Sequence, residues 1–483
     1  MMAKVELTTR RRNFIVAVML ISAFVAILNQ TLLNTALPSI MRELNINEST
    51  SQWLVTGFML VNGVMIPLTA YLMDRIKTRP LYLAAMGTFL LGSIVAALAP
   101  NFGVLMLARV IQAMGAGVLM PLMQFTLFTL FSKEHRGFAM GLAGLVIQFA
   151  PAIGPTVTGL IIDQASWRVP FIIIVGIALV AFVFGLVSIS SYNEVKYTKL
   201  DKRSVMYSTI GFGLMLYAFS SAGDLGFTSP IVIGALIISM VIIYLFIRRQ
   251  FNITNALLNL RVFKNRTFAL CTISSMIIMM SMVGPALLIP LYVQNSLSLS
   301  ALLSGLVIMP GAIINGIMSV FTGKFYDKYG PRPLIYTGFT ILTITTIMLC
   351  FLHTDTSYTY LIVVYAIRMF SVSLLMMPIN TTGINSLRNE EISHGTAIMN
   401  FGRVMAGSLG TALMVTLMSF GAKIFLSTSP SHLTATEIKQ QSIAIGVGVD
   451  ISFAFVAVLV MAAYVIALFI REPKEIESNR RKF

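Results

Sequence analysis

The chain has 483 residues, of which 57% are hydrophobic and only 11% are charged. This composition excludes a soluble globular protein and indicates an integral membrane protein that is all α-helical. A hydrocarbon core of about 30 Å is crossed by roughly 20 apolar residues in a helix. Apolar runs of this length predict fourteen transmembrane helices, at residues 14–34, 52–73, 81–99, 102–126, 137–161, 169–189, 205–223, 230–249, 267–291, 301–322, 333–352, 358–380, 396–420 and 446–470.

The positive charges indicate an orientation in the membrane. The net charge is +16, and most of the 34 Lys and Arg residues fall on one side if the spans alternate. Cytoplasmic loops of membrane proteins carry such an excess, so the N- and C-termini are expected in the cytoplasm and no binding to nucleic acid is expected. The basic clusters that anchor this topology near anionic lipid are residues 10–12, 196–203, 261–266 and 480–482.

The two ends of the sequence repeat each other weakly at an almost constant offset. The segment AYLMDRIKTRP at 70–80 returns as GKFYDKYGPRP at 323–333, which sets Asp74 against Asp327, and Arg109 corresponds to Arg368. This repeat predicts two six-helix bundles with two extra helices between them, a 6 + 2 + 6 arrangement. The expected domains are residues 1–191, 192–265 and 266–483. Parallel repeats of this kind are typical of transporters that alternate access to a site at the midplane.

The fifth predicted span carries small residues and proline on one face. Gly137, Gly141, Gly144, Gln148, Pro151, Pro155 and Gly159 recur at helical spacing. A face without bulk allows close approach of another helix or a ligand, and the prolines remove backbone hydrogen bonds. The segment is therefore interpreted as a pivot, and an ordinary packing seam of small residues is the alternative.

Two short loops pair an acidic residue with basic residues at helix ends. Asp74 and Arg75 follow the second span, and Asp327 and Gly330 follow the tenth. Breaking such contacts would change the energy difference between two arrangements of the helices, so the loops are predicted to act as a gating latch. A simply anchored loop is the other interpretation.

Arginines fall inside predicted spans, whereas carboxylates lie only near span ends. Arg109, Arg368 and Arg403 are the embedded cations, and such residues are functional candidates by default. A structural brace is the alternative for Arg368 and Arg403. Three cations without an embedded acid predict a cavity of positive potential that disfavours cationic compounds. The predicted lining of the substrate cavity is Asn29, Gln30, Asn34, Gln148, Asn315, Arg368, Asn380, Asn400 and Arg403.

Three segments resemble the signature motifs of the major facilitator superfamily. They are the loop motif at 70–81, the pattern LMLARVIQAMGAG at 105–117 and the stretch APAIGPTVTG at 150–159. With LNQTLLNTALP at 28–38 and SWRVPF at 166–171, the chain is similar to the fourteen-span drug:proton antiporters, in particular to multidrug exporters of the lincomycin-resistance type. The resemblance covers the whole chain. It implies the major facilitator fold and proton-driven export of structurally varied amphipathic small molecules, such as antibiotics and other toxic compounds, through alternating access. 

The resemblance also implies roles for individual residues. Arg109 and Gln112 would belong to the proton-linked motif, and Gly154 and Pro155 would form the pivot together with Pro151. The sequence departs from the family at Ala70 and Lys77, where glycines are usual, and at Asn29 and Gln30, where many relatives carry an acid. An amide cannot exchange a proton near neutral pH.

Proton coupling therefore requires an acid elsewhere. The candidates are Asp74, Asp163, Asp224, Asp327 and Asp450, and Asp163 ranks first because it ends the fifth span.

The chain shows no HExxH, GxSxG or P-loop motif, so neither an enzyme nor direct use of ATP is expected. Cys271 and Cys350 lie in apolar spans and indicate no metal or cofactor site. The expected protein is a monomeric, multi-pass transporter of a bacterial cell membrane; uptake of a metabolite by symport and a receptor or scaffold without transport are the rival functions.

Overall fold

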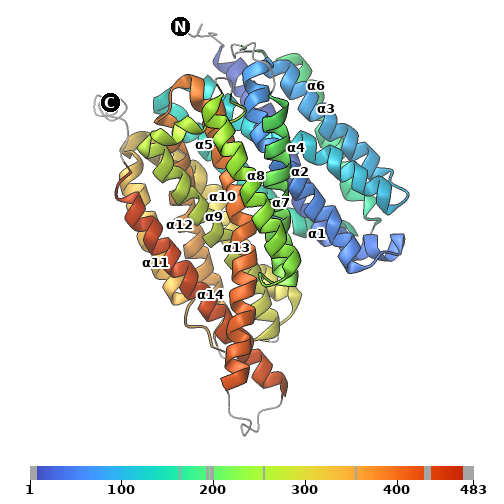
Figure 1. The fold of residues 1–483 in the computed structure, drawn as a ribbon, viewed down its shortest axis with the longest axis vertical. Coiled ribbons are helices and arrows are strands. Elements are labelled where there is room, and N and C mark those ends of the chain that lie inside the picture. Colours follow the sequence, from blue (N-terminus) through green and yellow to red (C-terminus); the bar gives the residue numbers. More distant parts are fainter. Residues whose placement is uncertain are drawn as a thin grey trace. The chain divides into compact units, whose positions relative to one another are not determined.

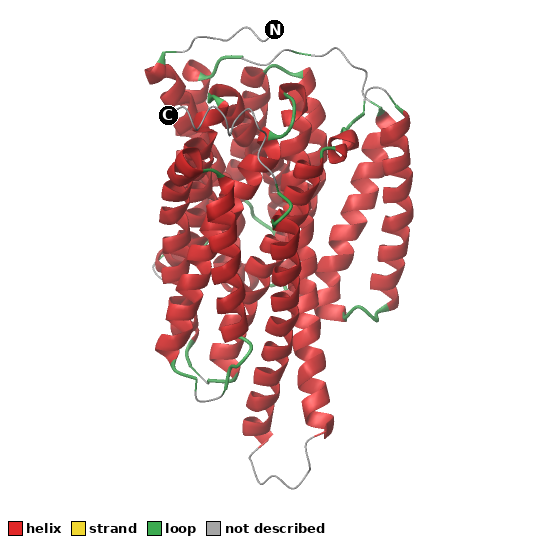
Figure 2. Cartoon of the chain, turned by 90° about the vertical axis from the view of Figure 1, so that its left-hand side faces the viewer, coloured by secondary structure: helices red, strands yellow, loops and turns green. Residues whose placement is uncertain are grey.

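The computed structural model describes residues 8–162, 165–191, 195, 201–253, 256–297, 299–353, 356–428 and 437–470. Within helices, the structure does not describe the side chains at positions 34, 48, 49, 152, 155, 156, 159, 160, 223, 224, 301, 302 and 437–442. In this part of the chain Figure 2 shows helices joined by loops and no strand. The all-helical prediction is confirmed.

Fourteen α-helices are described, and each overlaps one predicted span (Figure 1). They are α1 (Thr9–Leu44), α2 (Glu48–Arg75), α3 (Thr78–Ala97), α4 (Phe102–Leu130), α5 (Arg136–Ile162), α6 (Arg168–Ser188), α7 (Lys202–Leu225), α8 (Pro230–Asn252), α9 (Arg266–Asn295), α10 (Ala301–Tyr329), α11 (Pro331–Met348), α12 (Tyr358–Asn385), α13 (Ile392–Thr428) and α14 (Glu437–Ala467).

Twelve of these helices are long and apolar enough to cross a membrane, judged on the described residues. The two outside this group are α5, in which several side chains are not described, and α11. The α11 helix has 18 residues, opens with Pro331-Arg332-Pro333 and contains five threonines, which lower its hydropathy. The chain is a multi-pass membrane protein, and the count of fourteen spans stays a prediction.

Helix ends follow local sequence signals. The side chains of Asn47, Asn101 and Asn265 each accept a hydrogen bond from the backbone N–H three residues later, at 2.8, 3.0 and 3.2 Å. Asn101 thereby starts α4 only a few residues after α3 ends, which separates two spans that the sequence joins closely. Between α10 and α11, Gly330 adopts φ +82°, a conformation that favours glycine, and Pro331 begins the next helix.

The chain divides into two compact units. Unit 1 comprises Met1–Tyr217, Ile237–Val262 and Leu387–Phe401, and unit 2 comprises Ala218–Leu236, Phe263–Ser386 and Gly402–Phe483. In unit 1, α1 packs on α2, α4 and α6, and α3 packs on α2, α4 and α6. In unit 2, α9 packs on α10, α12 and α14, and α11 packs on the same three helices. The helix pairs thus recur in the order expected of repeated bundles, and the three predicted domains stay a prediction.

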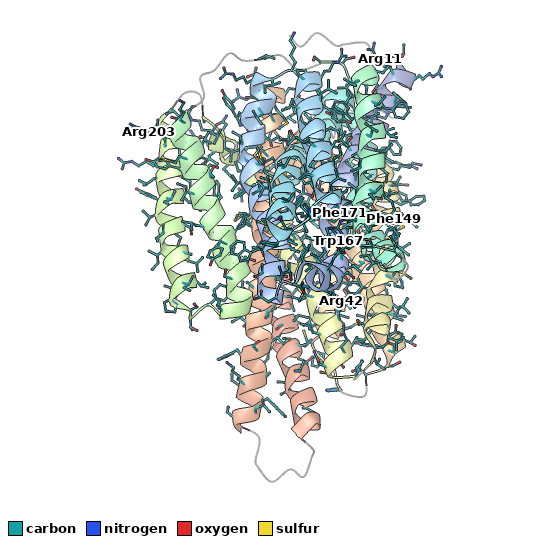
Figure 3. The ribbon with its side chains drawn as sticks, turned by 90° about the vertical axis from the view of Figure 1, so that its right-hand side faces the viewer. Arg11, Arg42, Phe149, Trp167, Phe171 and Arg203 are labelled. Carbon is teal, nitrogen blue, oxygen red and sulfur yellow. The ribbon has the colours of Figure 1, made fainter. Side chains whose placement is uncertain are left out.

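The SWRVPF segment ties three helices of unit 1 together. Trp167 is buried and donates from Nε1 to Glu43 on α1 at 2.8 Å, and its ring lies edge-on to Phe171 (Figure 3). Arg168 binds Glu43 and donates to the carbonyl of Ala99 after α3 at 2.9 Å. The hydrogen bond from Arg168 lowers the pKa of Glu43 below its ordinary value. The segment therefore joins α1 and the end of α3 to the start of α6.

The start of α7 and the end of α8 are joined by a charged contact in unit 1. Asp201 accepts hydrogen bonds from Arg249 at 2.5 and 2.9 Å and from Ser204 at 2.5 Å. These bonds, led by the one from Arg249, lower the pKa of Asp201 to about 2. This contact thus holds the two helices of the predicted extra pair together at their basic end.

Close backbone contact makes glycine necessary between α3 and α4. A Cβ atom added at Gly115 would lie 2.5 Å from the carbonyl oxygen of Ala85 and 2.7 Å from the amide nitrogen of Phe89. Both atoms belong to backbone and cannot rotate away. At Gly176 on α6, by contrast, an added Cβ would meet no atom within 4 Å.

We expect Gly115→Ala to destabilise the protein by about 1–3 kcal/mol, because the new methyl group must force α3 and α4 apart. Gly176→Ala is the matched control, and it should leave stability unchanged or raise it by about 0.5–1 kcal/mol because alanine favours the helix. Thermal unfolding of the purified proteins in one detergent measures both. Equal stability of the two variants would contradict the packing described.

Candidate functional site

Arg109 on α4 is the centre of a buried polar cluster in unit 1. Arg109, Gln112, Asn29 and Ser93 are each fully buried. Arg109 donates from Nη1 to Gln112 Oε1 at 2.9 Å and to the backbone oxygen of Asn29 at 3.4 Å, and from Nε to the backbone oxygen of Leu54 at 3.3 Å. The predicted proton-linked residues Arg109 and Gln112 are therefore brought together with Asn29, which was predicted for the cavity.

Gln112 extends the Arg109 cluster to two further helices. Its Nε2 donates to Asn29 Oδ1 at 3.4 Å and to Ser93 Oγ at 3.1 Å. The guanidinium group of Arg109 lies 4.2 Å from the ring centre of Phe58, a cation–π contact. Asn29, Phe58, Ser93 and Arg109 come from α1, α2, α3 and α4. The cluster thus connects the first four helices.

Arg368 on α12 occupies the equivalent place in unit 2. It is fully buried, donates to Thr346 Oγ1 on α11 at 2.5 Å and donates to the backbone oxygen of Ser281 on α9. Ser93 and Thr346 are separated by 253 residues, the offset that separates Asp74 and Asp327. In each unit a buried arginine of the fourth helix therefore reaches the backbone of the first helix and is linked to a hydroxyl of the third.

Asp74, a predicted latch residue, contacts the first turn of α13 within unit 1. Its Oδ1 accepts a hydrogen bond from Ser393 Oγ at 2.6 Å, and its Oδ2 lies 3.2 Å from His394 Nε2. His394 Nδ1 in turn accepts from the backbone N–H of Asn259 at 3.3 Å. Because Nδ1 is an acceptor, the ring proton lies on Nε2 and faces Asp74. The carboxylate also lies favourably at the positive end of α13.

The other latch residues lie at helix ends as predicted. Arg75 donates to the hydroxyl of Tyr71, one turn earlier on α2. Asp327 is in the last turn of α10 and is partly buried, and Gly330 forms the turn to α11. A latch role for these residues stays a prediction.

The predicted pivot lies on a continuous helix. The α5 backbone is helical from Arg136 to Ile162, through both Pro151 and Pro155. A Cβ added at Gly154 would lie 2.4 Å from Thr31 Oγ1 on α1, so α5 and α1 approach closely there. This contact fits the small-residue seam as well as the pivot, and the pivot role stays a prediction.

The predicted cavity residues are distributed over both units. Asn400 donates from Nδ2 to Gln124 Oε1 on α4 at 2.8 Å within unit 1. In unit 2, Asn315 Nδ2 lies 3.9 Å from the sulfur of Met369, and Asn380 Oδ1 is buried without a hydrogen-bond partner. Gln30 and Gln148 are partly buried, and Arg403 is buried. The side chains of Asn34 and Pro155, and the whole of Asp163, lie outside the described residues. A shared cavity stays a prediction.

Several contacting residues were not predicted from the sequence. Gln124 was missed because nothing in its local sequence indicates a partner on α13. Ser393 was missed for the same reason. Ser93 and Thr346 could have been found, because the repeat that relates Asp74 to Asp327 also relates this pair.

Buried arginines, repeated helix pairs and long apolar helices together define the class of protein as a polytopic membrane transporter built from repeated bundles. The comparisons with known proteins agree. Residues 19–411 match the sequence profile of the Major Facilitator Superfamily. The chain belongs to this family.

Two bacterial relatives are similar over most of their length. The chain is 42% identical over 432 residues to the uncharacterized MFS-type transporter YcnB of Bacillus subtilis, covering 89% of this chain and 92% of the relative. It is 40% identical over 412 residues to the lincomycin resistance protein LmrB of the same organism, covering 85% and 86%. The human organic anion transporter MFSD10 has the same fold, with a TM-score of 0.64, 12% identity and coverage of 94% of this chain and 99% of that structure.

We expect Asp74→Asn to destabilise the protein by about 2 kcal/mol, because hydrogen bonds to a charged group are worth about 1.5–3 kcal/mol and two are weakened together. Glu390→Gln is the matched control, since Glu390 is an exposed acid just before α13; it should change stability by less than about 0.5 kcal/mol. Thermal unfolding at neutral pH measures the difference. Similar losses in the two variants would mean that loss of charge alone, and not the contact with Ser393 and His394, explains the effect.

Proposed function

We propose that the protein is a multidrug efflux transporter that exports amphipathic antibiotics and other toxic compounds by proton antiport with alternating access. The observation that carries this proposal is the 40% identity to the lincomycin resistance protein LmrB over 85% of the chain. The geometry supports transport as such, because arginines buried within membrane spans, here Arg109 and Arg368, are functional candidates by default.

The proposal includes the arrangement in the membrane. In this proposal the protein crosses a bacterial cell membrane fourteen times, has both termini in the cytoplasm and works as a monomer. The latch would be formed by Asp74, Arg75, Asp327 and Gly330, and the pivot by Pro151, Gly154 and Pro155. The contact of Asp74 with Ser393 and His394 supports the first assignment, because it joins two helices far apart in the sequence.

The buried arginines favour substrates without a net positive charge. Arg109, Arg368 and Arg403 are all buried, and Arg109 and Arg368 donate hydrogen bonds to carbonyl, amide and hydroxyl groups. A monovalent cation at about 8 Å from one such arginine is repelled by about 2 kcal/mol at an effective dielectric constant of about 20. Neutral, zwitterionic and anionic compounds are therefore the proposed substrates.

Export can be tested in everted membrane vesicles that contain the protein and generate a pH gradient. We expect gradient-dependent accumulation of neutral or zwitterionic antibiotics, at least about tenfold faster than that of ethidium-like cations because of the repulsion by the buried arginines. Vesicles treated with an ionophore that collapses the pH gradient are the control. Accumulation only when the gradient is reversed would favour metabolite symport, and no accumulation would favour a receptor or scaffold.

The proton-coupling acid can be found by replacing Asp74, Asp163, Asp224, Asp327 and Asp450 with Asn one at a time. We expect Asp163→Asn to abolish export driven by the pH gradient while efflux down a drug gradient continues, because the amide cannot carry the proton. Asp450→Asn serves as a comparison for Asp163→Asn. The side chain of Asp450 is described: it lies on α14 and accepts a hydrogen bond from the backbone N–H of Leu352 at 3.0 Å. Gradient-driven export that survives all five replacements would exclude coupling through these acids.

A further inference from the structure

The Arg109 cluster contains more hydrogen-bond donors than acceptors. Arg109 Nη2 and Asn29 Nδ2 are both buried and have no hydrogen-bond partner. Each of these nitrogen atoms carries two N–H groups. Both residues belong to one hydrogen-bonded group, since Arg109 donates to the backbone oxygen of Asn29. Four N–H groups of one buried cluster are thus left without an acceptor.

The orientation of the Asn29 amide follows from the charge on Arg109. A guanidinium group only donates, so it must face the Oε1 atom of Gln112. The Nε2 atom of Gln112 then faces Asn29, and only the Oδ1 atom of Asn29 can accept from it. The remaining atom of Asn29 is the Nδ2 donor. The excess of donors is therefore imposed by Arg109 and is not removed by turning either amide.

The positive charge of Arg109 is not balanced by the groups that it contacts. It contacts two backbone carbonyls, the amide of Gln112 and the ring of Phe58. All four are neutral, and Arg109 is fully buried. Burying an uncompensated charge is strongly unfavourable, and the cation–π contact offsets only part of this cost. Among the described residues, the cluster offers no acceptor for these remaining N–H groups and no negative charge for Arg109.

We propose that the cluster formed by Asn29, Gln112 and Arg109 is a binding site for a small monovalent anion of halide size. An anion accepts hydrogen bonds from Arg109 and Asn29 without donating any, and it neutralises the single guanidinium charge, so that the proposed repulsion of cationic substrates then rests on Arg368 and Arg403. A water molecule would accept two of these bonds but would bring two further donors into a cluster that already has too many. A bound anion would also stabilise the junction of α1, α2, α3 and α4, which the cluster connects.

The site can be tested on the purified full-length protein without any transported compound, so the result does not depend on the proposed function. Thermal unfolding is measured at constant ionic strength while sodium gluconate is replaced by sodium chloride or bromide. We expect a saturable rise in Tm with halide concentration, because a ligand that binds only the folded state stabilises it.

The decisive variant is Asn29→Asp, which places a carboxylate where the anion is proposed. We expect this variant to lose the halide-dependent rise in Tm, since its own negative charge compensates Arg109. Asn315→Asp is the matched control: it adds a carboxylate at another buried asparagine, in unit 2, and should keep the full halide effect. A general effect of salt would act on both variants alike.

Two results would overturn the proposal: a wild-type Tm that does not respond to halide, or an Asn29→Asp variant that responds as strongly as the wild type. If Asn29→Asp does not fold, chloride-35 NMR on the wild-type protein decides the question. Line broadening that excess bromide reverses supports the site, and broadening that is absent or that bromide does not reverse rejects it.

Discussion

The hydrogen bonds of Arg109 to backbone carbonyl groups are the interaction on which this structure depends most. In hydrocarbon no water is available, so a buried polar group that finds no partner within the protein is costly. Arg109 takes the carbonyl oxygens of Asn29 and Leu54 even though they lie in helical segments. A carbonyl oxygen has two lone pairs, so it can accept from Arg109 without giving up its helical bond. One arginine can therefore join several helices without breaking them.

The same solution occurs twice in the chain, with different details. Arg368 reaches the backbone of Ser281 and the hydroxyl of Thr346 directly, whereas Arg109 is linked to Ser93 through Gln112. The first cluster thus contains an extra amide side chain, and two of its nitrogen atoms, Arg109 Nη2 and Asn29 Nδ2, have no partner, whereas at the second cluster this holds for Arg368 Nε. The repeated architecture is shared, but the chemistry of the two clusters is not. This asymmetry is the physical basis for assigning them different roles.

Much of the fold could be predicted because its signals are local. The apolar runs, the asparagine caps at Asn47 and Asn101 and the turn at Gly330 each depend on a few neighbouring residues. The candidate site could be predicted only in part. That Arg109 is buried follows from its place in an apolar run, but its partners come from helices distant in the sequence. The contacts of Gln124 with Asn400 and of Asp74 with Ser393 depend on tertiary packing, which no local pattern encodes.

Within unit 1, the α2 helix connects the Arg109 cluster with the contact between Asp74 and α13. Near its start the backbone oxygen of Leu54 accepts a bond from Arg109, and at its end Asp74 binds the first turn of α13. These residues are about 30 Å apart along a helix with a rise of about 1.5 Å per residue. Pro67 lies between them and leaves one helical hydrogen bond unmade. A change in the bonding of Arg109 would therefore act on one end of a helix whose other end carries Asp74. Because both contacts bear on the same helix, a displacement of α2 along its axis would have to be accommodated at both of them.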